Sequence, residues 1–239
     1  MHVPDGFFNA ATSVGAGMVS AGAIAASLRK AASELSDRLV PLAGLVGAFV
    51  FALQMLNFPV ASGTSGHLIG GALAAVLVGP WIGCLCLAVV LLVQALLFAD
   101  GGITAYGINV VLIAVVPSFV GWGAFRTARA LLPASRAAVV TASGVAAFVS
   151  VPVAAALFAV LFAVGGSVDV GFGSVLAAMV GVHLLVGIGE ALITGAVVSA
   201  VVATRPDLVR GARDLVPAPA LRARAAGDVA GGVAGEVRA

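Results

Sequence analysis

The chain has 239 residues, of which 62% are hydrophobic and only 9% are charged. Soluble domains carry about 25% charged residues, so this composition excludes a water-soluble globule of this size. Several uncharged stretches also approach or exceed the ~20 apolar residues that a helix needs to cross a bilayer. The net charge is only +2, and we expect a lipid bilayer rather than a nucleic acid as the surrounding partner.

Seven apolar segments predict an all-α, polytopic transmembrane bundle of about seven helices. In chain order they are residues 8–28, 39–57, 66–79, 81–99, 107–125, 137–164 and 174–203. The first is polar for a spanning helix and is predicted to pack inside the bundle. The third would be about 21 Å long at 1.5 Å per residue, shorter than the ~30 Å hydrocarbon layer. It is therefore predicted to begin below the membrane surface, behind a re-entrant-looking loop at 57–65.

The basic residues predict the orientation of the bundle. All twelve lie in alternate connections: Arg29, Lys30 and Arg38; Arg126, Arg129 and Arg136; then Arg205, Arg210, Arg213, Arg222, Arg224 and Arg238. Because cytoplasmic loops carry the excess of Lys and Arg, the N-terminus and the loops 57–65, 99–106 and 165–173 are predicted to lie outside. The C-terminus is then cytoplasmic and the protein a multi-pass component of the plasma membrane. Residues 1–205 form the predicted transmembrane domain, and residues 206–239 a flexible basic tail.

The chain contains three histidines, and two of them lie on the predicted outer side. His2 is in the N-terminal segment, and His67 opens the third apolar segment. The third, His183, lies within the last span, with Glu190 seven residues later on the same helix face. Ionisable groups inside a span suggest function, but an interhelical polar contact explains His183 and Glu190 equally well.

A histidine at position two can take part in a chelate. The terminal amine of Met1, with a pKa near 7.7–8.0, the following amide nitrogen and the His2 imidazole can form fused rings around one metal ion. A second imidazole from His67 would complete four nitrogens. Such an all-nitrogen, roughly planar site favours Ni²⁺, Cu²⁺ or Co²⁺ over Zn²⁺, which prefers a tetrahedron. From spacing alone, a chance Met-His start remains an alternative.

Five sequence blocks resemble the signature blocks of the CbiM/NikM family, in order and with compatible spacing. They are residues 1–7 (MHVPDGF), 57–60 (NFPV), 63–68 (GTSGHL), 94–102 (QALLFADGG) and 183–194 (HLLVGIGEALIT). This family comprises the cobalt- and nickel-specific substrate-binding membrane components of energy-coupling factor (ECF) transporters. The resemblance implies a Co²⁺ or Ni²⁺ importer component, with cobalt uptake for cobalamin synthesis slightly preferred. It also implies an ECF transmembrane coupling subunit and two ATPase subunits as partners, with a small accessory membrane subunit in some relatives.

The resemblance also implies which residues form the site. The metal would be held by the amine of Met1, the amide and imidazole of His2, and the imidazole of His67. Residues that fall in matching blocks are expected to orient these ligands: Asn57, Thr64, Ser65 and Asp100. Asp5 could hold the N-terminal segment in place, although we favour a solvated turn residue before Gly6.

No ATP site or enzymatic activity is expected in this chain. A P-loop requires Gly-Lys-Ser/Thr, whereas Lys30, the only lysine, precedes Ala31; ATP hydrolysis would therefore occur on separate chains. Two other functions remain open. Ser65 and His183 could form the Ser–His pair of a rhomboid-like intramembrane protease. The same metal site could also serve an uncoupled channel, although tight chelation suits fast permeation poorly.

Overall fold

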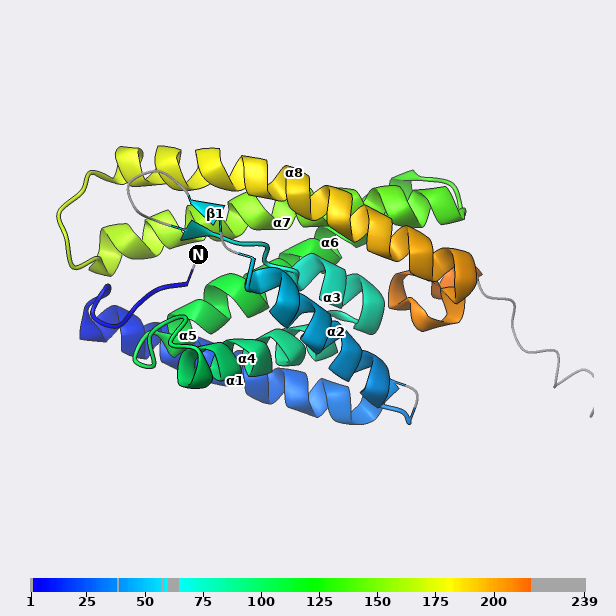
Figure 1. Cartoon of the computed structure of the whole chain (residues 1–239), viewed down its shortest axis with the longest axis horizontal. Coiled ribbons are helices and arrows are strands. Elements are labelled where there is room, and N and C mark those ends of the chain that lie inside the picture. Colours follow the sequence, from blue (N-terminus) through cyan, green and yellow to red (C-terminus); the bar gives the residue numbers. More distant parts are fainter. Residues whose placement is uncertain (1, 38, 57, 60–64, 216–239) are drawn as a thin grey trace, which may run out of the picture.

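The structure is a computed structural model that describes residues 2–37, 39–56, 58–59 and 65–215. It is an elongated helical bundle in which the long helices α7 and α8 lie side by side (Figure 1). The helices are α1 (Ala10–Glu34), α2 (Leu39–Gln54), α3 (Gly71–Val78), α4 (Pro80–Leu97), α5 (Tyr106–Asn109), α6 (Val116–Leu131), α7 (Arg136–Gly165) and α8 (Phe172–Thr204). A π-helical segment, Val110–Val115, joins α5 to α6. Two short strands, β1 (Phe58–Pro59) and β2 (Ser65–Gly66), pair antiparallel before α3.

The helical bundle predicted from the apolar segments is confirmed. Each of the seven segments contains a helix, because α5, the π segment and α6 form one run from residue 106 to residue 131. Five of these helical runs in the described residues are long and apolar enough to cross a membrane, and α2 is a shorter apolar helix. The chain is therefore a multi-pass membrane protein.

The third segment is helical over a shorter range than predicted. Its helix, α3, begins at Gly71, so His67 precedes the helix instead of opening it. Gly70 has a φ of +77°, a left-handed conformation that cannot continue into a regular helix. All eight residues of α3 are buried among α2, α4, α6 and α7. Gly79, with a φ of +96°, separates α3 from α4, and Pro80 begins α4, a position where its missing N–H is tolerated.

The prediction that the first segment packs inside the bundle is wrong. Helix α1 is peripheral, and the side chains of Val14, Met18 and Val19 are exposed. Its two buried serines, Ser20 and Ser27, face the protein. This pattern is what a bilayer favours, because apolar side chains can face lipid while the small polar side chains face the protein; Ser20 donates to the carbonyl of Gly17 in its own helix. The two buried serines therefore mark the inner face of α1, and the polar residues of this segment do not show that the whole helix is buried.

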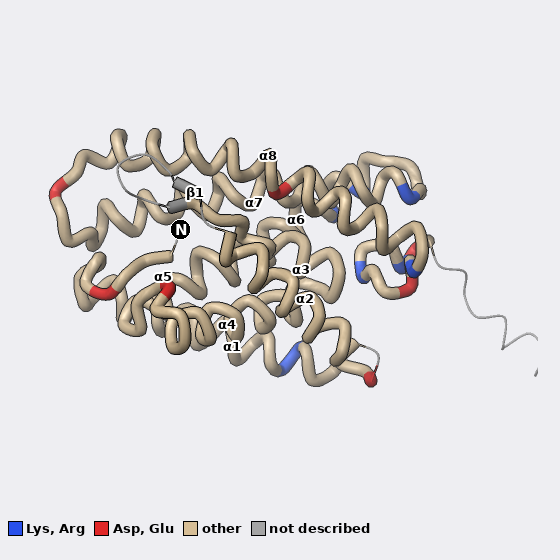
Figure 2. Tube along the Cα trace, viewed as in Figure 1, with Lys and Arg blue, Asp and Glu red and all other residues tan. Residues whose placement is uncertain are grey.

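The described basic residues lie toward one end of the bundle. The described Lys and Arg residues lie in the half away from the N-terminus (Figure 2). In that half, residues 206–215, predicted as the start of the flexible tail, form two 3₁₀ turns, Pro206–Leu208 and Arg210–Leu215. Val209 and Ala212 are fully buried there, and Arg210 Nη1 lies 3.1 Å from Glu34 Oε2 on α1. Residues 216–239 of the predicted tail lie outside the described residues.

Candidate metal site

The N-terminal segment is held by the loop that connects α4 to α5. The N–H of Gly102 donates to the carbonyl of Val3 over 2.8 Å. The N–H and the hydroxyl of Thr104 donate to Asp5 Oδ1 over 2.7 and 2.5 Å, and these hydrogen bonds lower the pKa of Asp5. Asp5 therefore holds the segment in place, which is the less favoured of its two predicted roles.

The same loop contacts His2 through a carboxylate. His2 Nδ1 lies 2.7 Å from Asp100 Oδ1, and this hydrogen bond lowers the pKa of Asp100. A carboxylate next to one ring nitrogen fixes the orientation and tautomer of an imidazole. With Nδ1 as the donor, the lone pair of His2 is on Nε2, which is buried without a hydrogen-bond partner in the described structure.

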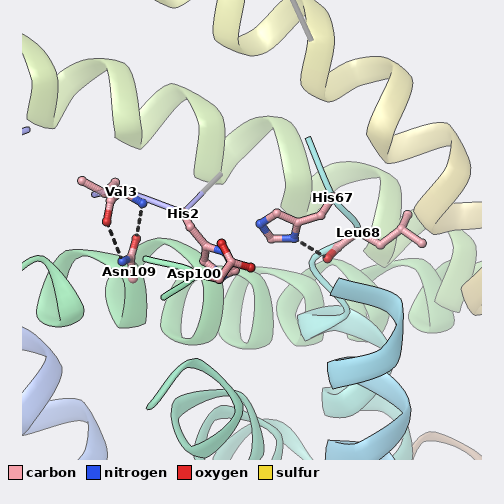
Figure 3. A network of polar contacts seen from close by, with 6 residues as sticks. All are labelled: His2, Val3, His67, Leu68, Asp100 and Asn109. Atoms are coloured by element: carbon pink, nitrogen blue, oxygen red, sulfur yellow. Dashed lines mark hydrogen bonds and ion pairs between the residues drawn. The ribbon is translucent and has the colours of Figure 1, made fainter. Parts of the chain in front are cut away.

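The second imidazole, that of His67, is 2% exposed. Its Nδ1 donates to the carbonyl of Leu68 over 2.8 Å. Its Nε2 is buried and has no hydrogen-bond partner in the described part of the chain. Burial lowers the pKa of His67 well below its ordinary value, so the ring stays neutral and its lone pair is available to a metal. The rings of His2 and His67 are stacked, with centroids 4.4 Å apart and planes inclined by 26°; Figure 3 shows the two residues next to each other.

The backbone after His67 is fixed by two helices. Gln54 Nε2, at the end of α2, donates to the carbonyl of Ile69 over 2.7 Å. The carboxyl group of Glu190, on α8, accepts hydrogen bonds from the N–H groups of Ile69 and Gly70. Glu190 therefore makes the interhelical contact that was one of its two predicted roles, and this contact lies beside the candidate site.

His183 is buried on α8. Its Nδ1 donates to the carbonyl of Met179 over 2.7 Å, within its own helix. The pKa of His67 is lowered first by burial and then by the positive charges of the terminal amine and of His2. The charge of His183 lowers it by a smaller amount. His183 is thus a neighbour of the candidate site whose polar contact is intrahelical.

One residue of this region, Asn109, was not predicted from the sequence. Its side-chain amide accepts from the N–H of Val3 over 2.8 Å and donates to the carbonyl of Val3 over 3.1 Å. The only signal in the sequence was a single amide between Ile108 and Val110 in an otherwise apolar run. Hydropathy does not show what such an amide contacts.

Several predicted site residues cannot be placed. Met1, Asn57 and Thr64 lie outside the described residues, and for Ser65 only the backbone, in β2, is described. Within the described ranges, no group of three or more His, Cys, Asp and Glu side chains is placed to hold a metal ion. In the described part of the predicted site, the imidazoles of His2 and His67 stack on each other, and the Asp100 carboxylate is hydrogen-bonded to His2.

Comparisons with a family model and with known proteins agree on one family. A family model described as the cobalt uptake substrate-specific transmembrane region, CbiM, matches residues 2–208. A protein of Archaeoglobus fulgidus that carries the name of a fused nickel transport protein, NikMN, is 38% identical over 209 residues, covering 87% of this chain and 68% of the relative. The cobalt transport protein CbiM of Sorangium cellulosum is 36% identical over 192 residues, covering 78% of this chain and 84% of the relative.

A solved structure has the same fold. The crystal structure of a truncated transition metal transporter aligns with a TM-score of 0.79 and 31% sequence identity. The alignment covers 85% of this chain and 99% of that chain. The relatives are transport proteins, so the arrangement of helices described above is that of a metal transporter.

Proposed function

Because the chain belongs to the CbiM family, described as the cobalt uptake substrate-specific transmembrane region, we propose that it binds Co²⁺ or Ni²⁺ through His2 and His67. The observation that carries this proposal is the pair of stacked, buried imidazoles of His2 and His67, in which the Nε2 atom of His67 has no partner in the described structure. Buried polar groups are normally hydrogen-bonded, and an exception calls for an explanation such as an ion. A transported metal ion bound by the Nε2 atom of His67 provides that explanation.

Four nitrogens form the proposed coordination set. They are the terminal amine of Met1, the amide and imidazole of His2, and the imidazole of His67. In His2, Nδ1 is the ring nitrogen close enough to the backbone to close a chelate ring with the residue's own amide. In this structure that nitrogen is hydrogen-bonded to Asp100. Chelation therefore requires the hydrogen bond between His2 and Asp100 to break. Nitrogen ligands in a plane suit Ni²⁺ and related ions.

The proposed transport direction follows from the charges. The end of the bundle that carries His2 would face outward, and the end that carries the Lys and Arg residues would face the cytoplasm, following the positive-inside rule. Import would be driven by ATPase subunits on separate chains, through an ECF transmembrane coupling subunit. We prefer cobalt as substrate because the matching family model is described by cobalt uptake, although a relative carries a nickel name.

Metal quantification on purified protein tests the proposal. Protein with a native N-terminus and a C-terminal tag should retain Co²⁺ or Ni²⁺ after dialysis, measured by mass spectrometry of the metal. His2→Ala and His67→Ala should each lose the metal, whereas His183→Ala should lose much less, since its hydrogen bond stays within α8. Affinity should also rise with pH, because the amine and amide must release protons. Retention of the metal by His67→Ala would refute the site.

The chelate makes a sharper prediction at the N-terminus. One extra residue before Met1 should abolish tight binding, because it displaces the terminal amine, whereas the C-terminal tag should have no effect. Normal Ni²⁺ or Co²⁺ binding by the extended protein would show that the amine is not a ligand. Metal uptake by cells that lack the ATPase subunits would instead favour an uncoupled channel.

A further inference from the structure

The side-chain amide of Asn109 lies in an apolar interior. It is 3% exposed, and its neighbours Ile108 and Val110 are fully buried. A buried amide without hydrogen bonds is strongly unfavourable. Asn109 must therefore obtain its hydrogen bonds from the protein.

Asn109 directs both of its polar atoms at one residue, Val3. Its Oδ1 accepts from the N–H of Val3, and its Nδ2 donates to the carbonyl of Val3 (Figure 3). This is how a neighbouring strand would bind the same backbone groups, but here a helix side chain does so. Val3 is itself 1% exposed, and it directly follows His2.

The space around this contact is tightly limited. A Cβ atom on Gly101 would come within 3.0 Å of Asn109 Nδ2 and 3.7 Å of His2 Cβ. The loop backbone thus passes beside both side chains, and the glycine, with a φ of +95°, leaves the room they need. Asn109 also directly precedes the π segment Val110–Val115, a rare helix geometry that occurs frequently at functional sites.

We infer that Asn109 is a positioning residue for metal capture: by fixing the N–H and carbonyl of Val3, it places the His2 backbone and ring opposite His67. This inference rests on the proposed function. It adds a connection between the helical run Tyr106–Leu131 and the N-terminal segment, whose residues 2–7 form neither a helix nor a strand.

Two variants of Asn109 test the inference. Asn109→Leu removes both hydrogen bonds, and Asn109→Asp keeps the shape and the acceptor but places an oxygen opposite the carbonyl of Val3. Ser143→Ala is the control, since Ser143 is buried in α7 and its hydroxyl bonds within that helix. Two quantities are measured: the Kd for Ni²⁺ by calorimetry, and hydrogen exchange in a peptide covering residues 2–8 of the metal-free protein.

Both Asn109 variants should bind Ni²⁺ about tenfold more weakly or worse, which corresponds to the loss of one or more buried hydrogen bonds. Residues 2–8 should exchange faster in both variants, and Ser143→Ala should match the unmodified protein in both measurements. Because Asn109→Asp conserves shape, its loss of affinity cannot arise from a cavity.

The possible failures are distinguishable. If Asn109→Asp and Asn109→Leu bind Ni²⁺ as tightly as Ser143→Ala, or exchange at residues 2–8 is unchanged, the inference about Asn109 is overturned while the proposed function stands. If the unmodified protein binds neither Ni²⁺ nor Co²⁺, the proposed function is wrong, and a positioning role in metal capture is overturned with it.

Discussion

The Glu190 carboxyl group connects the last helix, α8, to the backbone beside His67. It accepts hydrogen bonds from the N–H groups of Ile69 and Gly70, and the residue is only 3% exposed. Glu190→Ala leaves these two N–H groups buried without an acceptor, and each such group costs about 1–3 kcal/mol. We therefore expect this substitution to lower the free energy of unfolding by about 2–6 kcal/mol. Because Ile69 is two residues from His67, Ni²⁺ affinity should also fall.

The assay is thermal unfolding in detergent, with and without Ni²⁺, and two further variants make it specific. Glu190→Gln offers an amide oxygen in the same place and should recover most of the stability. Thr194→Val changes a buried residue one turn further along α8 and should cost less than Glu190→Ala. If the free energy of unfolding of Glu190→Ala is within about 0.5 kcal/mol of that of Thr194→Val, the range of an ordinary neutral substitution, the hydrogen bonds to Ile69 and Gly70 do not stabilise the fold.

Two further predictions concern the same region. Burial lowers the pKa of His67 below its ordinary value of 6.5, so as the pH falls below 6.5 the unfolded chain takes up a proton that the folded chain does not. Stability should thus decrease over this range, and a His67→Phe variant whose unfolding shows the same decrease would contradict the assignment. For Gly102→Ala, a Cβ atom would collide with the backbone nitrogen of Asp5, which should displace the N-terminal segment and weaken Ni²⁺ binding roughly 5- to 150-fold. The control Gly123→Ala meets open space in α6, and an equal loss there would show that the effect is not local.

Much of the architecture could be predicted from composition and charge. A chain with 9% charged residues has too few to cover a soluble globule, and long apolar runs must form helices in lipid because every backbone N–H and C=O needs a partner within its own segment. The placement of Lys and Arg in alternate connections predicted the charge asymmetry seen in Figure 2. Hydropathy, segment length and the position of basic residues can be read directly from the sequence, without knowing which helices contact each other.

The contacts of the candidate site depend on residues that are distant in the sequence. His2 meets Asp100, Val3 meets Asn109, and Glu190 meets Ile69. The sequence blocks indicated His2, His67 and Asp100 as members of one site, but they could not show that the backbone beside His67 is held from α8. Nor could they distinguish Asn109 from any other amide in an apolar helix.

Composition, charge pattern and the ordered sequence blocks were enough to predict a multi-pass helical membrane protein with two imidazoles at one end. How those imidazoles are held depends on the packing of the helices, which places the N-terminal segment against the α4–α5 loop and Asn109, and the backbone after His67 against Gln54 and Glu190. The physical reason is that hydropathy records how strongly each residue avoids water. It does not record which buried donor meets which buried acceptor, and that pairing exists only after the helices have packed.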